Sequence, residues 1–248
     1  GVTLNVMKDM VSRFNKSQDK IVVTANNQGQ SYEENLRKYE GASSKPSQLP
    51  QVIYLEDNAL GEMVDKGQVL PAEGCMKADD YDITQITPVA RSGFSVDGVL
   101  YPGYMNVSSP VLYFNKSDFQ KAGLDPENPP RTLDEIEAAA KKLKDTGVAG
   151  KPLSFNLKPW FFENWMSGLG EDIVNNDNGR TKPATKATFA NENGTKLVTW
   201  LQDMNKKGLM VPFADTEGTI DHYLALLNKD RKKRASMLIE TSTATTTV

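Results

Sequence analysis

Apolar residues near the start of the chain recur every three or four positions. Leu4, Met7, Val11 and Phe14 fall on one face of a helical wheel, and charged or polar residues occupy the other face. This is the period of an amphipathic helix, in which an apolar stripe packs inward and the remaining surface meets water. The pattern predicts a helix over the first part of the chain.

Two further helices are indicated by the residues that open them. Ser31 and Thr132 are each followed three residues later by a glutamate, Glu34 and Glu135. This spacing is a capping box, in which both side chains satisfy free backbone N–H groups of the first turn. Apolar spacing with terminal glycines or caps predicts other helices at residues 58–67, 160–169, 191–208 and 223–227.

Short runs of β-branched and aromatic residues alternate with these helices. They predict strands at residues 21–25, 52–55, 111–114 and 237–239. Strands and helices that alternate in short units are typical of an α/β fold with a mostly parallel sheet.

Composition narrows the function classes. The 248 residues are enough for one large domain or two modest ones, and a formal net charge of −3 offers no basic field for nucleic acid or an acidic membrane. No apolar run approaches the roughly 18 residues that span a bilayer. Cys75 is the single cysteine, which excludes an internal disulfide, and we expect it to be a small buried residue.

The motifs of common catalytic sites are missing from the sequence. It has no glycine-rich nucleotide loop and no Gly-x-Ser-x-Gly elbow. A catalytic triad would need His222, the single histidine, which we interpret as a surface or helix-packing residue. The adjacent acids Asp79-Asp80 and Glu33-Glu34 do not converge on one point. We therefore predict no bond chemistry, no cofactor and no metal site.

The most specific pattern lies in residues 98–144. An extended piece reaches the polar corner Asn106-Val107-Ser108-Ser109-Pro110, and Val-Leu-Tyr-Phe-Asn-Lys follows. A short helix and a Pro-rich turn then precede the helix that Thr132 opens. The order and identity of these residues resemble solute-binding proteins of bacterial ABC importers, above all the branch that binds glycerol-3-phosphate or glycerophosphodiesters. The likeness is weaker but collinear over residues 13–70 and 190–243.

This resemblance implies a type II periplasmic-binding-protein architecture, an α/β fold with a ligand cleft between two lobes. Residues 1–107 would form the first lobe, 108–238 the second, and 239–248 would cross back toward the first. Members of the family are longer at both ends, so we expect a fragment with an incomplete first lobe. Ligands of open α/β sheets bind beyond the carboxyl ends of strands, and two lobes can close over a solute.

The resemblance also implies ligand contacts in the first lobe. Tyr32 lies at a strand-to-helix turn, where its ring can stack and its hydroxyl can bond; packing on its own helix is the alternative. A carboxylate bonds ligand hydroxyls at the turn after residues 52–55. Glu56 and Asp57 both fit that place, and a plain helix-start charge is the competing interpretation. Tyr104 is a weaker candidate.

Further contacts are implied at the polar corner and in the second lobe. Ser108 and Ser109 stand at the corner, and at least one is expected to touch ligand. Trp160 could pack against the carbon chain of a glycerol ligand, with Trp165 as the alternative. Trp200 is expected to lie in the core beneath its helix. Ser242 follows the last strand, where its hydroxyl and nearby N–H groups could donate to an anion.

The resemblance implies a receptor that captures a small-molecule solute and delivers it to ABC permease subunits in the membrane. It would be a monomer, without nucleic acid, at the extracellular face with a lipid anchor or in the periplasm. A sugar ligand on the same architecture is the alternative. Other classes left open are a small cytosolic α/β enzyme, or an interaction module with an exposed apolar patch.

Overall fold

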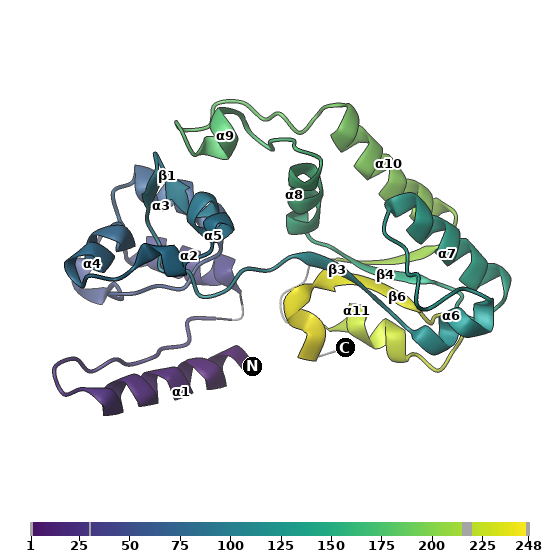
Figure 1. Cartoon of the computed structure of the whole chain (residues 1–248), viewed down its shortest axis with the longest axis horizontal. Coiled ribbons are helices and arrows are strands. Elements are labelled where there is room, and N and C mark those ends of the chain that lie inside the picture. The colour runs from purple at the N-terminus through teal and green to yellow at the C-terminus, as the bar shows by residue number, and fades with distance from the viewer. Residues whose placement is uncertain (1, 30, 215–219, 247–248) are drawn as a thin grey trace. The chain divides into compact units, whose positions relative to one another are not determined.

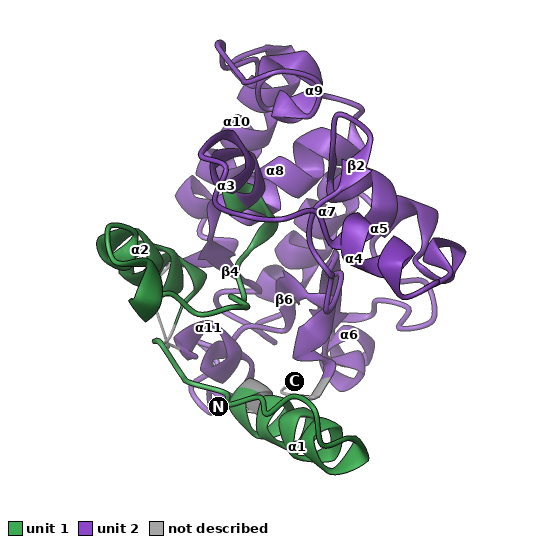
Figure 2. Ribbon diagram, turned by 90° about the vertical axis from the view of Figure 1, so that its left-hand side faces the viewer, with its two compact units in different colours: residues 1–59 green, residues 60–248 purple. Residues whose placement is uncertain are grey.

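A computed structural model describes residues 2–29, 31–214 and 220–246 of the chain. They fall into two compact units, residues 1–59 and residues 60–248, coloured separately in Figure 2. The lobe boundary expected near residue 107 stays a prediction. None of the described helices is both long enough and apolar enough to cross a bilayer.

The first unit is built from helices. Helix α1 (Val2–Ser17) and helix α2 (Tyr32–Ala42) confirm the predicted pattern, and two 3₁₀ turns follow, η1 (Pro46–Gln48) and η2 (Asp57–Ala59). The Ser31 side chain accepts a hydrogen bond from the backbone N–H of Glu34 at 3.1 Å. That bond satisfies one of the N–H groups that an opening turn leaves free.

The strands predicted at 21–25 and 52–55 are wrong: both segments are outside any strand. A strand needs a neighbour for its N–H and C=O groups, and the described part of this unit offers none. Instead, the amide side chain of Asn15 both donates to and accepts from the backbone of Val23, at 2.8 and 2.9 Å. Val22 and Val52 consequently remain 83% and 88% exposed.

The second unit begins with short elements. They are α3 (Leu60–Asp65), α4 (Ala72–Ala78), η3 (Ile83–Gln85), α5 (Pro88–Gly93) and the hairpin strands β1 (Ser95–Val96) and β2 (Val99–Leu100). Ile86, Ala90 and Leu100 form a small core. The expectation that Cys75 is buried is wrong, because α4 buries none of its residues fully and this side chain is exposed.

A four-stranded sheet organises the rest of the second unit (Figure 1). Its strands are β3 (Pro110–Phe114), β4 (Leu153–Leu157), β5 (Met210–Ala214) and β6 (Met237–Thr241), in the order β3-β6-β4-β5. Strands β6, β4 and β5 are parallel, and β3 is antiparallel to β6. The sheet is therefore mostly parallel, as predicted.

Helices cover both faces of this sheet. One face packs on α6 (Lys116–Ala122), α7 (Leu133–Asp145), α8 (Pro159–Gly168) and α10 (Glu192–Lys206), which share one apolar core with the strands. The other face meets α11 (Asp221–Leu224), which is followed by η4 (Ala225–Leu227). Figure 1 shows α7 and α10 on one side of the sheet and α11 on the other. The short α9 (Asn175–Gly179) lies between α8 and α10, and η5 (Ser242–Thr246) follows β6.

Two features predicted for the helices on this face are present in the structure. The capping box of Thr132 and Glu135 is complete at the start of α7. Trp200 is buried, and its indole N–H donates to the carbonyl of Leu133 at 3.2 Å, so its assignment to the core is confirmed. Each large apolar side chain buried here contributes about 1.5–3 kcal/mol.

Candidate functional site

Ser109 and Ser242, which are 133 positions apart in the sequence, are hydrogen-bonded to each other. The N–H of Ser109 donates to Oγ of Ser242 at 3.2 Å, and the N–H of Ser242 donates to the carbonyl of Ser109 at 2.8 Å. The structure therefore brings together two of the serines predicted to contact ligand.

Strand pairing positions this contact. Pro110 at the start of β3 pairs with Thr241 at the end of β6, so the residues just before and just after them lie opposite each other. The carboxyl end of β6 is at the same edge of the sheet as the carboxyl ends of the parallel strands β4 and β5. That edge is where ligands of open α/β sheets bind.

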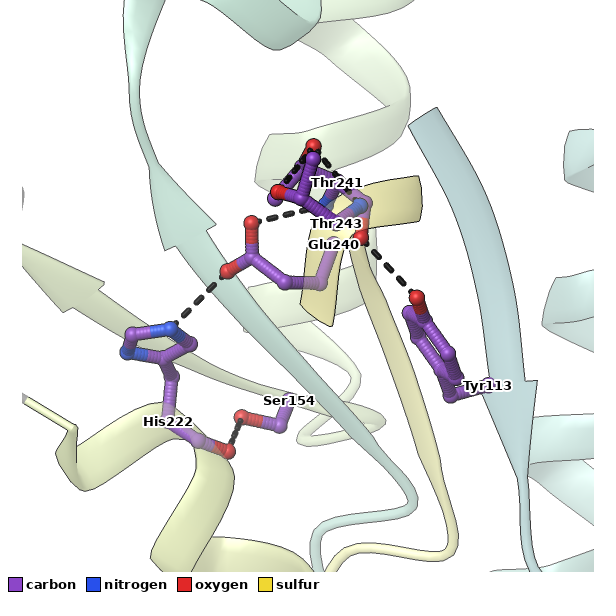
Figure 3. A network of polar contacts seen from close by, with 6 residues as sticks. All are labelled: Tyr113, Ser154, His222, Glu240, Thr241 and Thr243. Atoms are coloured by element: carbon purple, nitrogen blue, oxygen red, sulfur yellow. Dashed lines mark hydrogen bonds and ion pairs between the residues drawn. The ribbon is translucent and has the colours of Figure 1, made fainter. Parts of the chain in front are cut away.

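A buried polar network supports the strand end from inside (Figure 3). The carboxylate of Glu240 lies 2.9 Å from Nε2 of His222, and its other oxygen accepts from the N–H of Thr241 at 2.8 Å. The hydroxyl of Tyr113 donates to the carbonyl of Thr241 at 2.9 Å. The hydroxyl of Ser154 donates to the carbonyl of His222 at 2.8 Å.

This network lies in a dry environment. His222 and Glu240 are only 5% and 7% exposed. Burial, followed by the nearby Glu240 carboxylate, raises the pKa of Tyr223 above its ordinary value. Both causes disfavour a phenolate, so Tyr223 stays neutral beside the carboxylate. Of the two options given for His222, surface or helix-packing, the structure shows the second, because His222 is buried on α11.

Trp160 stands at the carboxyl edge of the same sheet. It is the second residue of α8, which begins two residues after β4 ends, and its ring meets Phe161 edge-on at 5.1 Å. Trp165, the alternative, stacks on Phe155 at 5.4 Å and meets Trp200 at 6.1 Å inside the core. Both rings are half-buried and pack against the same core, and Trp160 is the one that follows β4 directly at the carboxyl edge.

Ser108 and Tyr104, the other two ligand candidates of the second unit, have different surroundings. Ser108 immediately precedes the serine pair and is half-buried. Tyr104 stacks on Phe94, with ring centroids 6.3 Å apart, and packs against the small core around Leu100. Packing accounts for the position of Tyr104 without a ligand.

The first unit contains a separate aromatic and acidic group. The hydroxyls of Tyr32 and Tyr54 are 3.4 Å apart, and their rings meet edge-on at 5.3 Å. Burial raises the pKa of Tyr32, and the Tyr54 hydroxyl and the Glu56 and Glu33 carboxylates raise it further. Tyr32 therefore remains a neutral hydroxyl that can donate and accept.

The structure separates the two acids that the sequence left open. Glu56 is half-buried and acts electrostatically on Tyr32, whereas Asp57 is exposed in the turn η2. Glu56 is the better placed to act together with Tyr32.

Several members of these groups were missed by sequence reasoning. Tyr54 precedes Glu56 by two positions, and residues two apart in an extended segment point to the same side, so its position was a usable signal. The partnership of His222 and Glu240 had no such signal, because the two residues belong to separate elements.

The second unit is a mostly parallel sheet with helices on both faces and with hydroxyls and an aromatic ring at its carboxyl edge, which is an α/β arrangement. The chain belongs to the family of bacterial extracellular solute-binding proteins, whose profile matches residues 3–244. The predicted family and the predicted fold class, that of type II periplasmic binding proteins, are confirmed.

Three known proteins illustrate the similarity. The sn-glycerol-3-phosphate-binding periplasmic protein UgpB of Rhizobium meliloti is 32% identical over 184 residues, covering 72% of this chain and 42% of that protein. The crystal structure of UgpB from Mycobacterium tuberculosis in complex with glycerophosphocholine has a TM-score of 0.74 at 17% identity, over 95% of this chain and 58% of that one. The GacH receptor of Streptomyces glaucescens, solved unliganded and with acarbose, has a TM-score of 0.73 at 20% identity, over 96% and 57%.

The chain spans a little under half the length of the curated relatives it matches, 42% and 46% in two of them.

Proposed function

We propose that the protein is the solute receptor of an ABC importer and that it binds glycerol-3-phosphate or a glycerophosphodiester such as glycerophosphocholine. The contact between Ser109 and Ser242 is the observation that carries this proposal. The Ser242 oxygen accepts from a backbone N–H, so its own proton remains available to donate to a phosphate oxygen. The names of the relatives support the same ligand class.

The two groups of candidate residues supply different chemistry. Ser108, Ser109 and Ser242 offer hydroxyls for the phosphate, and Trp160 offers an apolar wall for the glycerol carbons. Tyr32 and Glu56 offer a hydroxyl and a carboxylate, which suit the hydroxyls of glycerol. They also suit the quaternary ammonium of a choline ester, since aromatic faces and carboxylates both attract cations.

The receptor would work without bond chemistry. It would capture its solute outside the cytoplasmic membrane, as a monomer, and pass it to permease subunits after a change in conformation. A lipid anchor would hold it at the cell surface, and a periplasmic location would serve equally.

Calorimetry on the purified protein tests the ligand class. We expect heat from glycerophosphocholine or sn-glycerol-3-phosphate and none from maltose. The variant Trp160→Ala should weaken binding, whereas Trp200→Phe, a conservative change inside the core, should leave it near wild type. Binding of maltose with no response to glycerol phosphates would reject the proposed ligand.

A sugar ligand is the second candidate. The structural similarity to the acarbose-bound GacH receptor favours it, as do the rings of Tyr32 and Trp160, because sugars stack on aromatic faces. The pair Ser242→Ala and Trp160→Ala separates the two: a phosphate ligand depends on both side chains, and a neutral sugar depends mainly on Trp160.

A further inference from the structure

Three loops meet at the amino-terminal edge of the parallel strands, opposite the edge that holds Ser109 and Ser242. These loops precede β4, β5 and β6. The N–H of Gly150 donates to the carbonyl of Arg231 at 2.6 Å, and the N–H of Lys151 donates to that of Arg234 at 3.2 Å. The ammonium of Lys144, at the end of α7, donates to the carbonyl of Lys207 at 2.7 Å.

Five cationic side chains from these loops form a group that we call the cationic edge: Lys144, Lys151, Arg231, Lys232 and Lys233. A methyl group built on Gly208 would lie 2.9 Å from the ammonium of Lys144 and 3.9 Å from that of Lys151. The ammonium groups of Lys144, at the end of α7, and of Lys151, in the loop that follows it, therefore lie close to the loop before β5. Arg231, Lys232 and Lys233 are exposed on the neighbouring loop.

The five charges of the cationic edge are not neutralised locally. Two other cations nearby do have an acidic partner. Arg234 lies 3.2 Å from the buried carboxylate of Asp118, and Lys207 lies 2.6 Å from the carboxylate of Glu137. The carboxylate of Asp230 accepts from the backbone N–H of Lys232 at 3.0 Å, and its carbonyl accepts from the N–H of Lys233 at 3.0 Å. Within residues 2–29, 31–214 and 220–246, no carboxylate forms an ion pair with a member of the cationic edge.

The folded chain thus concentrates positive charge that its overall composition conceals. The whole sequence has a formal net charge of −3, yet residues 229–234 alone contain five cations and one acid. Exposed charges act over about 10 Å at moderate salt, so a local cluster matters more to an approaching surface than the distant acids do.

An exposed apolar side chain adjoins this charge. Leu227, at the end of η4, is 76% exposed, two residues before the basic run. The N–H of Ala235 donates to the carbonyl of Ala225 at 2.9 Å, which closes residues 225–235 into one loop. Lysines and arginines beside an exposed leucine are the composition of surfaces that lie on a bilayer, where cations meet phosphates and the leucine enters the acyl boundary.

We propose that the cationic edge binds the surface of an anionic lipid bilayer. The solute-binding edge lies at the opposite end of the parallel strands, so contact of the cationic edge with lipid would leave it uncovered. This proposal is independent of the solute, because it uses none of the candidate ligand residues. Each cation near an anionic membrane contributes roughly fivefold to the affinity.

Vesicle sedimentation tests the proposal. The test vesicles contain phosphatidylcholine and about 30% phosphatidylserine. They carry negative charge without a free glycerol headgroup. Pure phosphatidylcholine vesicles are the control, and they also present the glycerophosphocholine group that the solute site would recognise. We expect binding to the anionic vesicles at low salt, a steep loss as salt increases, and none to pure phosphatidylcholine.

A matched pair of variants makes the test specific. The variant Arg231→Glu, Lys232→Glu, Lys233→Glu should weaken vesicle binding by about 100-fold or more. The variant Lys182→Glu, Lys186→Glu, Lys196→Glu changes the net charge equally at exposed positions elsewhere in the same unit and should bind nearly as wild type. Circular dichroism melting checks that both variants fold.

Three outcomes would overturn the proposal. The first is wild-type vesicle binding by the Arg231, Lys232, Lys233 variant, and the second is equal loss in both variants. The third is no binding to anionic vesicles; retention on an acidic polypeptide would in that case assign the edge to a protein partner. Solute affinity measured alongside keeps this result distinct from the fate of the proposed function.

Discussion

Nε2 of His222 lies 2.9 Å from a carboxylate oxygen of Glu240, and both side chains are buried against the sheet that carries Ser242. Glu240 also accepts the N–H of Thr241, so this carboxylate joins α11 to the end of β6. The serine that we propose to meet the solute comes two residues after Glu240. The end of β6 beside that serine is therefore held by a buried contact between two elements.

Replacement of Glu240 should show how much this contact contributes. We expect Glu240→Ala to lower the free energy of unfolding by about 3 kcal/mol, because it leaves buried polar groups of His222 and Thr241 without a partner. Glu240→Gln keeps an oxygen that can accept and should cost about half as much. Urea denaturation measures both, and equal losses in the two variants would contradict this account.

The pH dependence of stability should report Tyr223. Its folded pKa is raised above the ordinary value of about 10, so above that pH the unfolded chain loses a proton that the folded chain retains. This contribution is fully present below about pH 10 and is lost as the pH rises further.

The variant Tyr223→Phe isolates that contribution. We expect its unfolding free energy to fall less steeply between about pH 9 and pH 11, by up to about 1.4 kcal/mol per pH unit. Urea denaturation across this range is the measurement, and Tyr81→Phe, at an exposed position, is the control. Identical slopes for wild type and Tyr223→Phe would show that Tyr223 ionises equally in both states.

The serine contact allows its backbone and hydroxyl roles to be separated. Ser109 uses only its N–H and carbonyl in the contact, whereas Ser242 uses its N–H and its hydroxyl oxygen. Ser109→Ala should therefore preserve the contact, and Ser242→Ala should remove one of its two hydrogen bonds, at a cost of about 1 kcal/mol in stability.

Calorimetry with glycerophosphocholine then assigns the hydroxyls. We expect Ser242→Ala to weaken binding by about tenfold, the value of one hydrogen bond to a charged group. A loss confined to Ser109→Ala would transfer the ligand contact to Ser109. Unchanged affinity in both variants would remove the serine pair from the solute site.

Gly150 should tolerate no side chain. A methyl group there would lie 2.5 Å from the carbonyl oxygen of Lys232, well inside van der Waals contact. Gly150→Ala should therefore push apart the loops before β4 and β6 and lower the unfolding free energy by about 1–3 kcal/mol.

A second glycine provides the matched control. Gly168, in the last turn of α8, has open space around the same position, so Gly168→Ala should leave stability unchanged or raise it by up to about 1 kcal/mol. Thermal denaturation compares the two variants. Equal stability of Gly150→Ala and wild type would mean that the loops can separate without cost.

Sequence reasoning recovered elements whose signals are local. The helices opened by Ser31, Thr132 and Asn191 were predictable because a cap and an apolar stripe lie within a few residues of each other. Strand signals were less reliable. Strands β4 and β5 went unpredicted. In β5, Pro212 obscures the pattern, and the proline is tolerated because β5 is an edge strand.

The sequence by itself determined the family, the α/β class, the capped helices and the list of side chains able to meet a small polar solute. Only the tertiary structure showed which residues interact: Ser109 with Ser242, Tyr32 with Tyr54 and Glu56, and His222 with Glu240. It also gathered lysines from separate loops into the cationic edge. The physical reason is that capping and periodicity act between near neighbours, whereas strand pairing and burial join residues whose separation along the chain leaves no local trace.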